Sequence, residues 1–157
     1  MIKINRQLLD NLSEKARLAK RKRINHNFHP GNDAVLQRLL NALESGTYVR
    51  PHKHEKPDKN EVFIVLRGRI LVVEYEDDGT IDDYVILDHT TENYATEIPP
   101  RRYHSMLSLE NGTIAYEFKE GPYHPEIDKI FAPWSPEEGS PEVENFLNMI
   151  LEATLTQ

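Results

Sequence analysis

The chain has 157 residues, and its 19 Lys and Arg against 26 Asp and Glu give a formal net charge of −7. This length predicts a single domain with a substantial core. The chain has no cysteine, which excludes a disulfide framework and a thiolate metal site, so any metal must be bound by His, Asp, Glu or water. No apolar run approaches the roughly 20 residues that span a bilayer, and the N-terminus lacks the apolar region of a signal peptide. We therefore expect a soluble cytoplasmic protein with no membrane partner.

The first 23 residues carry eight basic and two acidic side chains, a charge of +6 that leaves −13 for the rest of the chain. Apolar residues recur here at helical spacing, at Leu8, Leu9, Leu12, Ala16 and Ala19. We predict an N-terminal helical arm over residues 1–30. A basic arm can bind nucleic acid, but the acidic body shows no nucleic-acid module. A capping helix docked on that body is the favoured interpretation, and nucleic acid is the least favoured partner.

The middle of the chain, residues 31–120, has the pattern of a β-barrel. Short segments rich in Val, Ile and Leu are separated by turn residues, among them Asp77–Thr80 and the hairpin signal Asn111-Gly112. Many short strands at such spacing are typical of a sandwich or barrel. The predicted strands are Val62–Leu66, Ile70–Tyr75, Tyr84–Leu87, Ala95–Ile98, His104–Leu109 and Thr113–Lys119.

Two flanking segments complete the prediction. In residues 34–43, leucines at helical spacing favour a helix locally, whereas the barrel requires a strand, and we predict the strand. Residues 121–157 contain a Pro-rich segment and then a helix over 141–154, with Pro141 at its first position and an apolar face that includes Phe146 and Ile150. We expect this helix to pack on the barrel.

A group of His and Glu residues carries the chemistry. His52 and His54 stand at i and i+2, which places both imidazoles on one face of a strand. Glu61 opens the next strand, and His104 opens a later one. Three imidazoles and a carboxylate form a nitrogen-rich metal site, and an octahedral metal would keep two positions open. Glu61 could instead pair with a lysine outside the site.

These residues resemble the motifs of the cupin superfamily. The spacing G-x5-HxH-x6-E-x6-G of Gly46, His52, His54, Glu61 and Gly68 resembles the first cupin motif, with a lengthened loop before the Glu. The segment that ends at His104 is similar to the second motif, P-x-G-x-x-H, although Arg101 stands where the motif has Gly.

Nearly the whole chain resembles the WbuC-like cupin-fold metalloproteins, on the runs RLLNALESGTYVRPHKHEKPDKNEVFIVLRG, EIPPRRYHSMLSLENGT and EFKEGPYHPEIDKIFAPWSPEEG. The resemblance implies a mainly β cupin (double-stranded β-helix, or jelly-roll) barrel with flanking N- and C-terminal α-helices. It also implies a metal in the barrel, a homodimer and an association with bacterial surface-polysaccharide gene clusters. The expected cofactor is one divalent transition metal per chain: Fe, Mn, Ni, Zn or Co.

Strand parity extends the site to a small-molecule pocket. Tyr48 and Arg50 share parity with His52, Met106 shares it with His104, and Phe63 shares it with Glu61. We predict Tyr48, Arg50, Phe63 and Met106 as substrate-binding residues. Arg50 requires a partner, either an anionic group of the substrate or a structural carboxylate. Either Glu117 and Lys119 or Tyr116 and Phe118 face inward, and the sequence leaves this open, as it does the role of His26 and His29.

The favoured function is a metal-dependent enzyme that acts on a small anionic or sugar-derived metabolite in surface-polysaccharide biosynthesis. Isomerase, epimerase and dioxygenase chemistry all fit this site. Glu61 and Tyr48 are the candidate catalytic residues for proton transfer. The alternative is a non-catalytic cupin that binds or senses a small molecule, since one fold hosts many functions.

Overall fold

The computed structural model describes residues 1–155. Within this range the chain forms a mainly β structure with one helix near each end. The elements are α1 (Arg6–Leu18), β1 (Arg23–Asn27), β2 (Leu36–Leu43), β3 (His52–Lys53), β4 (Glu61–Arg67), β5 (Ile70–Tyr75), β6 (Ile81–Leu87), β7 (Ala95–Ile98), β8 (Tyr103–Ser108), β9 (Thr113–Glu120), β10 (Ile130–Phe131) and α2 (Val143–Leu155).

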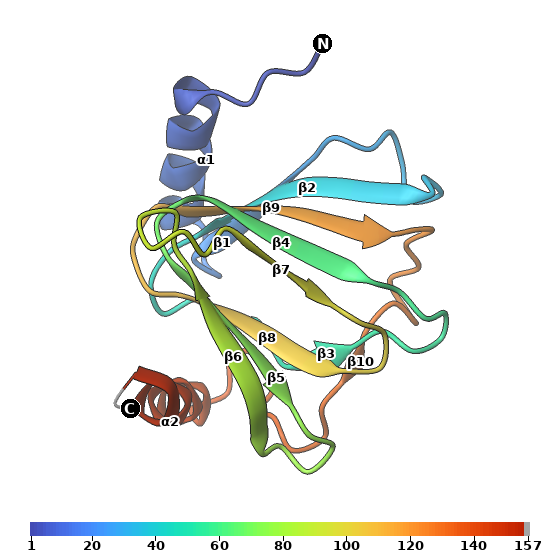
Figure 1. Cartoon of the computed structure of the whole chain (residues 1–157), viewed down its shortest axis with the longest axis vertical. Helices are drawn as coiled ribbons and strands as arrows, with labels where there is room; N and C mark the ends of the chain where they lie inside the picture. Colours follow the sequence, from blue (N-terminus) through green and yellow to red (C-terminus); the bar gives the residue numbers. More distant parts are fainter. Residues whose placement is uncertain (156–157) are drawn as a thin grey trace.

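The strands form two sheets that face each other (Figure 1). The first sheet has the order β1-β2-β9-β4-β7 and the second the order β10-β3-β8-β5-β6, with antiparallel pairing throughout. The predicted jelly-roll barrel with two flanking helices is therefore confirmed. Apolar side chains from the inner faces of both sheets fill part of the space between them: Leu43, Phe63, Val65, Ile70, Val72, Leu87, Ile98, Met106 and Ala115.

Helix α1 covers the outer face of the first sheet. Its buried residues Leu9, Leu12 and Ala16 pack against Leu40 and Ile114, which point outward from β2 and β9. This contact supports the capping-helix interpretation of the basic arm. The arm predicted over residues 1–30 also contains β1, which pairs along its whole length with β2, so the sheet begins earlier in the chain than the sequence indicated.

The segment with helical leucine spacing is the strand β2. Leu39 and Leu43 point into the barrel, whereas Leu40 and Ala42 point outward under α1. Both faces of this strand are covered, so apolar residues occur on both sides. Its sequence therefore lacks the alternation of apolar and polar residues that marks a half-exposed strand. The prediction of a strand over 34–43 is thus confirmed for Leu36–Leu43.

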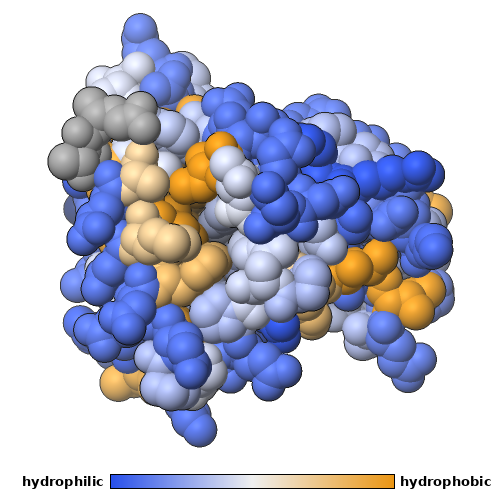
Figure 2. Space-filling view, turned by 90° about the horizontal axis from the view of Figure 1, so that it is seen from below, coloured by the Kyte–Doolittle hydropathy of each residue, from blue (hydrophilic) through white to orange (hydrophobic). Residues whose placement is uncertain are grey.

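Helix α2 covers the outer face of the second sheet. It begins at Val143, two residues later than predicted, and its Ile150 packs against Leu71, Val73 and Leu107. The face of the molecule on the α2 side is mostly hydrophilic, with apolar surface gathered over the helix at the left of Figure 2. Among residues 1–155, neither helix has the length and apolar character needed to cross a membrane.

The hairpin predicted at Asn111-Gly112 is wrong. These residues join β8 to β9, which lie in different sheets. The side chain of Asn111 accepts a hydrogen bond from the amide of Ser45, and Gly112 has a φ of 75°. A turn was predicted correctly here. A glycine with positive φ fits a hairpin turn and also a connection between two sheets, and only the strand pairing distinguishes these two cases.

Gly68 lies at the turn between the two sheets. Its φ is 73°, and an added Cβ would lie 2.3 Å from Thr113 Oγ1 and 3.1 Å from Thr113 Cα. We expect Gly68→Ala to lower the free energy of unfolding by about 2–5 kcal/mol, since left-handed strain costs about 1–2 kcal/mol and overpacking about 1–3 kcal/mol.

The matched control for this variant is Gly139→Ala. Gly139 has a φ of 88°, and a Cβ there would meet nothing within 4 Å. This substitution is expected to cost only the backbone strain, roughly 1–2 kcal/mol. Urea denaturation of both variants measures the difference, and equal losses would contradict the predicted clash with Thr113.

Candidate metal centre

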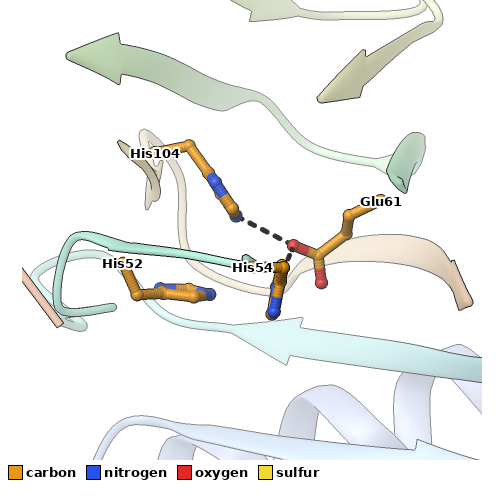
Figure 3. A group of neighbouring side chains, drawn as sticks. All are labelled: His52, His54, Glu61 and His104. Atoms are coloured by element: carbon orange, nitrogen blue, oxygen red, sulfur yellow. Dashed lines mark hydrogen bonds and ion pairs between the residues drawn. The ribbon is translucent and has the colours of Figure 1, made fainter. Parts of the chain in front are cut away.

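His52, His54, Glu61 and His104 meet inside the barrel. His52 and His104 are paired residues on β3 and β8, Glu61 begins β4, and His54 follows β3 directly. All four are 2–3% exposed, and one ligand atom from each lies within 4.8 Å of the others. Figure 3 shows the four side chains pointing toward one another. Within residues 1–155 the structure thus joins the four residues that the sequence predicted as metal ligands.

Backbone carbonyls orient all three imidazoles. Nδ1 of His52 is 2.9 Å from the Arg50 carbonyl oxygen, and Nδ1 of His104 is 3.0 Å from the Arg102 carbonyl oxygen. Nδ1 of His54 bonds the Asp128 carbonyl. Since a carbonyl oxygen only accepts, each Nδ1 carries a proton, and each neutral ring therefore presents an Nε2 lone pair to the centre of the cluster.

The Nε2 atoms lack suitable partners within the protein. Nε2 of His52 is buried without a hydrogen-bond partner. Nε2 of His54 and of His104 lie 3.3 Å and 2.8 Å from the same oxygen of Glu61 (dashed in Figure 3). In neutral rings with protonated Nδ1, these contacts set lone pairs against a carboxylate. A cation between them satisfies all four groups, so the residues fit a metal.

Spacing and donor type agree with this fit. A metal with bonds of about 2.0–2.1 Å to nitrogen and oxygen keeps its ligand atoms roughly 3–4 Å apart, slightly closer than the 4.8 Å observed. A small inward movement of the side chains would complete the site. Three imidazole nitrogens and one carboxylate, without thiolate, suit Fe, Mn, Ni, Zn or Co.

The surroundings lower the pKa of two of the four cluster residues, His52 and Glu61. Burial lowers the pKa of His52 well below its ordinary value, with nearby Lys129 and His104 acting in the same direction. Burial alone would raise the pKa of Glu61, but Lys119 and the adjacent imidazoles of His104 and His54 lower it well below its usual range. Metal binding therefore displaces few protons at neutral pH.

A buried network supports the cluster from the 121–129 segment. The carboxylate of Asp128 accepts from Lys59 Nζ at 2.5 Å and from Lys119 Nζ at 2.8 Å, and it lies 3.7 Å from His54 Nδ1. Lys59 is 2% exposed and also bonds the Pro122 carbonyl. The prediction that Glu61 might pair with a lysine holds only loosely, because Lys119 Nζ is 3.9 Å away.

Arg101 adopts the backbone conformation that glycine has in the second cupin motif. Its φ is 69°, and its amide donates to the His54 carbonyl at 2.9 Å. Its guanidinium pairs with Asp58, with N–O distances of 3.0–3.2 Å. The turn geometry is thus retained without glycine. The salt bridge is exposed, so it offsets only part of the cost of a left-handed residue.

A cavity of about 420 Å³ borders the cluster, and the predicted pocket residues divide around it. Arg50 and Met106 line the cavity, whereas Phe63 lies in the core with its ring 6.4 Å from that of His104. Tyr48 differs from its predicted position, because residues 44–51 form no strand and parity does not apply there. Its hydroxyl donates to the Pro136 carbonyl at 2.9 Å, outside the cavity.

The sequence left open whether the polar residues of β9 face the cavity, and it did not place Lys129, after β9, in the pocket. Glu117 and Lys119 line the cavity, and Tyr116 lies on the outer face near α1. Burial, with the nearby Glu61, raises the pKa of Glu117 to about 8, and Asn41 donates to its carboxyl group at 2.6 Å. Lys129 also lines the cavity. The alternating pattern of β9 was the only sequence signal, and it fitted either orientation.

The two facing sheets form a β-barrel, or jelly roll, of the cupin type. Matching solved structures include the capsular polysaccharide assembling protein CapF from Staphylococcus aureus (19% identity, TM-score 0.52) and protein SO0799 from Shewanella oneidensis (9%, TM-score 0.51). Each alignment covers 68% of this chain, but only 28% of CapF against 72% of SO0799. A cupin superfamily protein, DSY2733 from Desulfitobacterium hafniense, matches over 62% of this chain and 76% of its own length (10%, TM-score 0.49). The likenesses to CapF and SO0799 show the fold.

The chain belongs to the family described as a domain of unknown function, DUF6016, whose model matches residues 4–87. The matched region contains three of the four cluster residues, and His104 lies beyond it. No curated protein matches the chain.

Proposed function

We propose that the protein is a metal-binding cupin in which His52, His54, Glu61 and His104 hold one divalent transition metal. We further propose that it is an enzyme acting on a small anionic or sugar-derived metabolite in the adjoining cavity. The observation that carries the proposal is the set of inward-facing Nε2 atoms. Carbonyl groups hold all three rings in the tautomer that a metal requires, while Nε2 of His52 has no partner in the protein.

The metal would polarise a carbonyl or hydroxyl group of the ligand or lower the pKa of water. The chain's own residues bind and orient the ligand: Arg50 offers N–H donors, and Met106 contributes an apolar wall. Tyr48 is not proposed as a catalytic residue, since it lies outside the cavity. Glu61 remains the candidate for proton transfer, with its carboxylate 3.3 Å and 2.8 Å from Nε2 of His54 and His104.

The proposed biological setting is surface-polysaccharide biosynthesis in the cytoplasm, by an isomerase, epimerase or oxygenase reaction. The resemblance to WbuC-like cupins supports this setting, as does the likeness to a protein described as assembling capsular polysaccharide. A homodimer is part of the same proposal, and sedimentation analysis tests it directly.

Elemental analysis of the purified protein is expected to find about one divalent metal per chain. The double variant His52→Ala with His104→Ala is expected to retain less than about a tenth of it, because two of four ligands are lost. His89→Ala is the matched control, since His89 is exposed and lies outside the cluster. Stoichiometric metal in the double variant would rule out the site.

A further inference from the structure

The cavity has a polar wall where a barrel usually has core. Arg23, Asn25 and Asn27 of β1 line it, and so do Gln37 and Asn41 of β2. Within residues 1–155, the side-chain amides of Asn25 and Asn27 form no hydrogen bond. Both residues are exposed, so these amides stand open to solvent at the edge of the cavity. They are suited to a cavity that holds a ligand rich in hydroxyl groups, because a carboxamide both donates and accepts.

Two cations from the segments that lead into β3 and β10 face the same cavity. Arg50 donates from Nε and Nη2 to Ser135 (3.1 and 3.3 Å), and its guanidinium lies 5.0 Å from the centre of the Phe131 ring. These contacts fix the guanidinium and leave its other N–H groups free. Lys129, half-buried before β10, is the second cation. Neither residue forms an ion pair with any carboxylate in the described part of the chain.

The balance of charge in the cavity is opposite to that of the protein. Five basic residues line it (Arg21, Arg23, Arg50, Lys119 and Lys129) against Glu117 and Glu138. Glu138 is shared by Arg21 and Arg23, at 2.6 and 3.0 Å, and Lys119 faces Asp128 and Glu61. The two unpaired cations are therefore Arg50 and Lys129. In a chain with a net charge of −7, a positive pocket selects anions locally.

The cavity lies next to the cluster, although none of the four cluster residues lines it. Lys119 lines it and approaches Glu61 to 3.9 Å, and Met106 lines it two residues after His104 on β8. Its volume of about 420 Å³ falls within the roughly 300–1,000 Å³ of small-molecule sites. A ligand held between the two walls would thus lie beside the cluster.

We propose that this cavity binds an acidic sugar, whose carboxylate or phosphate pairs with Arg50 and Lys129 and whose hydroxyl groups bond Asn25 and Asn27. This inference rests on the proposed function, because it names the class of ligand presented to the metal. It assigns binding roles to Lys129, Asn25 and Asn27.

Calorimetric titration of the metal-loaded protein tests the proposal with D-glucuronate, glucose 6-phosphate, inorganic phosphate and the uncharged methyl glucoside. At least one acidic sugar is expected to bind about tenfold or more tightly than methyl glucoside, because charge-assisted hydrogen bonds are the strong ones. The two acidic sugars distinguish a carboxylate from a phosphate ligand. Absence of binding by all three anions, or equal binding of methyl glucoside, would overturn the proposal.

Variants assign the two walls separately. Arg50→Gln and Lys129→Gln are each expected to lower the affinity for the acidic sugar and for inorganic phosphate by about tenfold or more. The double variant Asn25→Ala with Asn27→Ala should lower the affinity for the acidic sugar and leave that for inorganic phosphate unchanged. Arg69→Gln is the control, since Arg69 pairs with Glu110 at 2.6 Å and lies outside this cavity. Unchanged affinity in both charge variants would contradict the assignment.

Metal content is measured in the same samples. A protein with full metal and no affinity for these anions would refute the ligand assignment alone. A protein without metal, in which His52→Ala changes nothing, would refute the proposed function itself.

Discussion

Removal of the metal is expected to lower the free energy of unfolding by about 4 kcal/mol when free metal had been present at 1,000 times its dissociation constant. The metal binds the folded chain only, because the four ligands converge from β3, β4 and β8 and their neighbours. The free protein also keeps Glu61 against two imidazole nitrogens at 2.8 and 3.3 Å.

Urea denaturation with and without a chelator measures this effect, and added metal should restore the lost stability. The variant His52→Ala with His104→Ala serves as the control, in which the chelator is expected to change nothing. Identical midpoints for the native protein in both conditions would contradict a bound metal.

Lys59→Met is expected to lower the free energy of unfolding by roughly 3–5 kcal/mol. Lys59 is 2% exposed, and its ammonium is bound to the fully buried carboxylate of Asp128 at 2.5 Å. Burial by itself would raise the pKa of Asp128, but Lys119 and Lys59 outweigh it and keep that pKa below its usual value. Without Lys59, a buried carboxylate loses one of its two ammonium partners.

The effect of Lys59→Met should extend to the metal. The Asp128 carbonyl holds His54 Nδ1, so movement of this segment releases a ligand, and second-layer changes typically cost about 10–100-fold in metal affinity. Lys56→Met is the matched control, because Lys56 is exposed. In a cycle with Asp128→Asn, the two losses should add to more than the double variant loses. Simple additivity would mean that the two side chains are not coupled.

The ligand set was predictable because its signal is local. A strand alternates its side chains, so His52 and His54 at i and i+2 face one way, and glycines at 46 and 68 occupy turns with φ of 75° and 73°. Arg101 shows the limit of such motifs. Its φ of 69° is retained by tertiary contacts with His54 and Asp58, although the residue itself disfavours that conformation.

The errors arose where sequence neighbours do not determine spatial neighbours. Asn111-Gly112 carries a hairpin signal, yet it joins strands of different sheets. Tyr48 was placed by strand parity in residues 44–51, where no strand forms. In each case a local rule was applied across a segment whose course is set by the packing of the two sheets.

By itself the sequence determined which four residues cluster in the barrel, the strand-rich body and the two amphipathic helices, because side-chain periodicity and turn chemistry are local properties. Only the tertiary structure decided which face of β9 turns inward. Helix α1 covers the outer face of that strand, so the aromatic Tyr116 faces the helix and the charged Glu117 and Lys119 face the cavity. The alternation of aromatic and charged residues along β9 indicates only that the two faces of the strand have different surroundings. Which of them lies inside depends on the element that packs over the other, and that helix lies about 100 residues earlier in the chain.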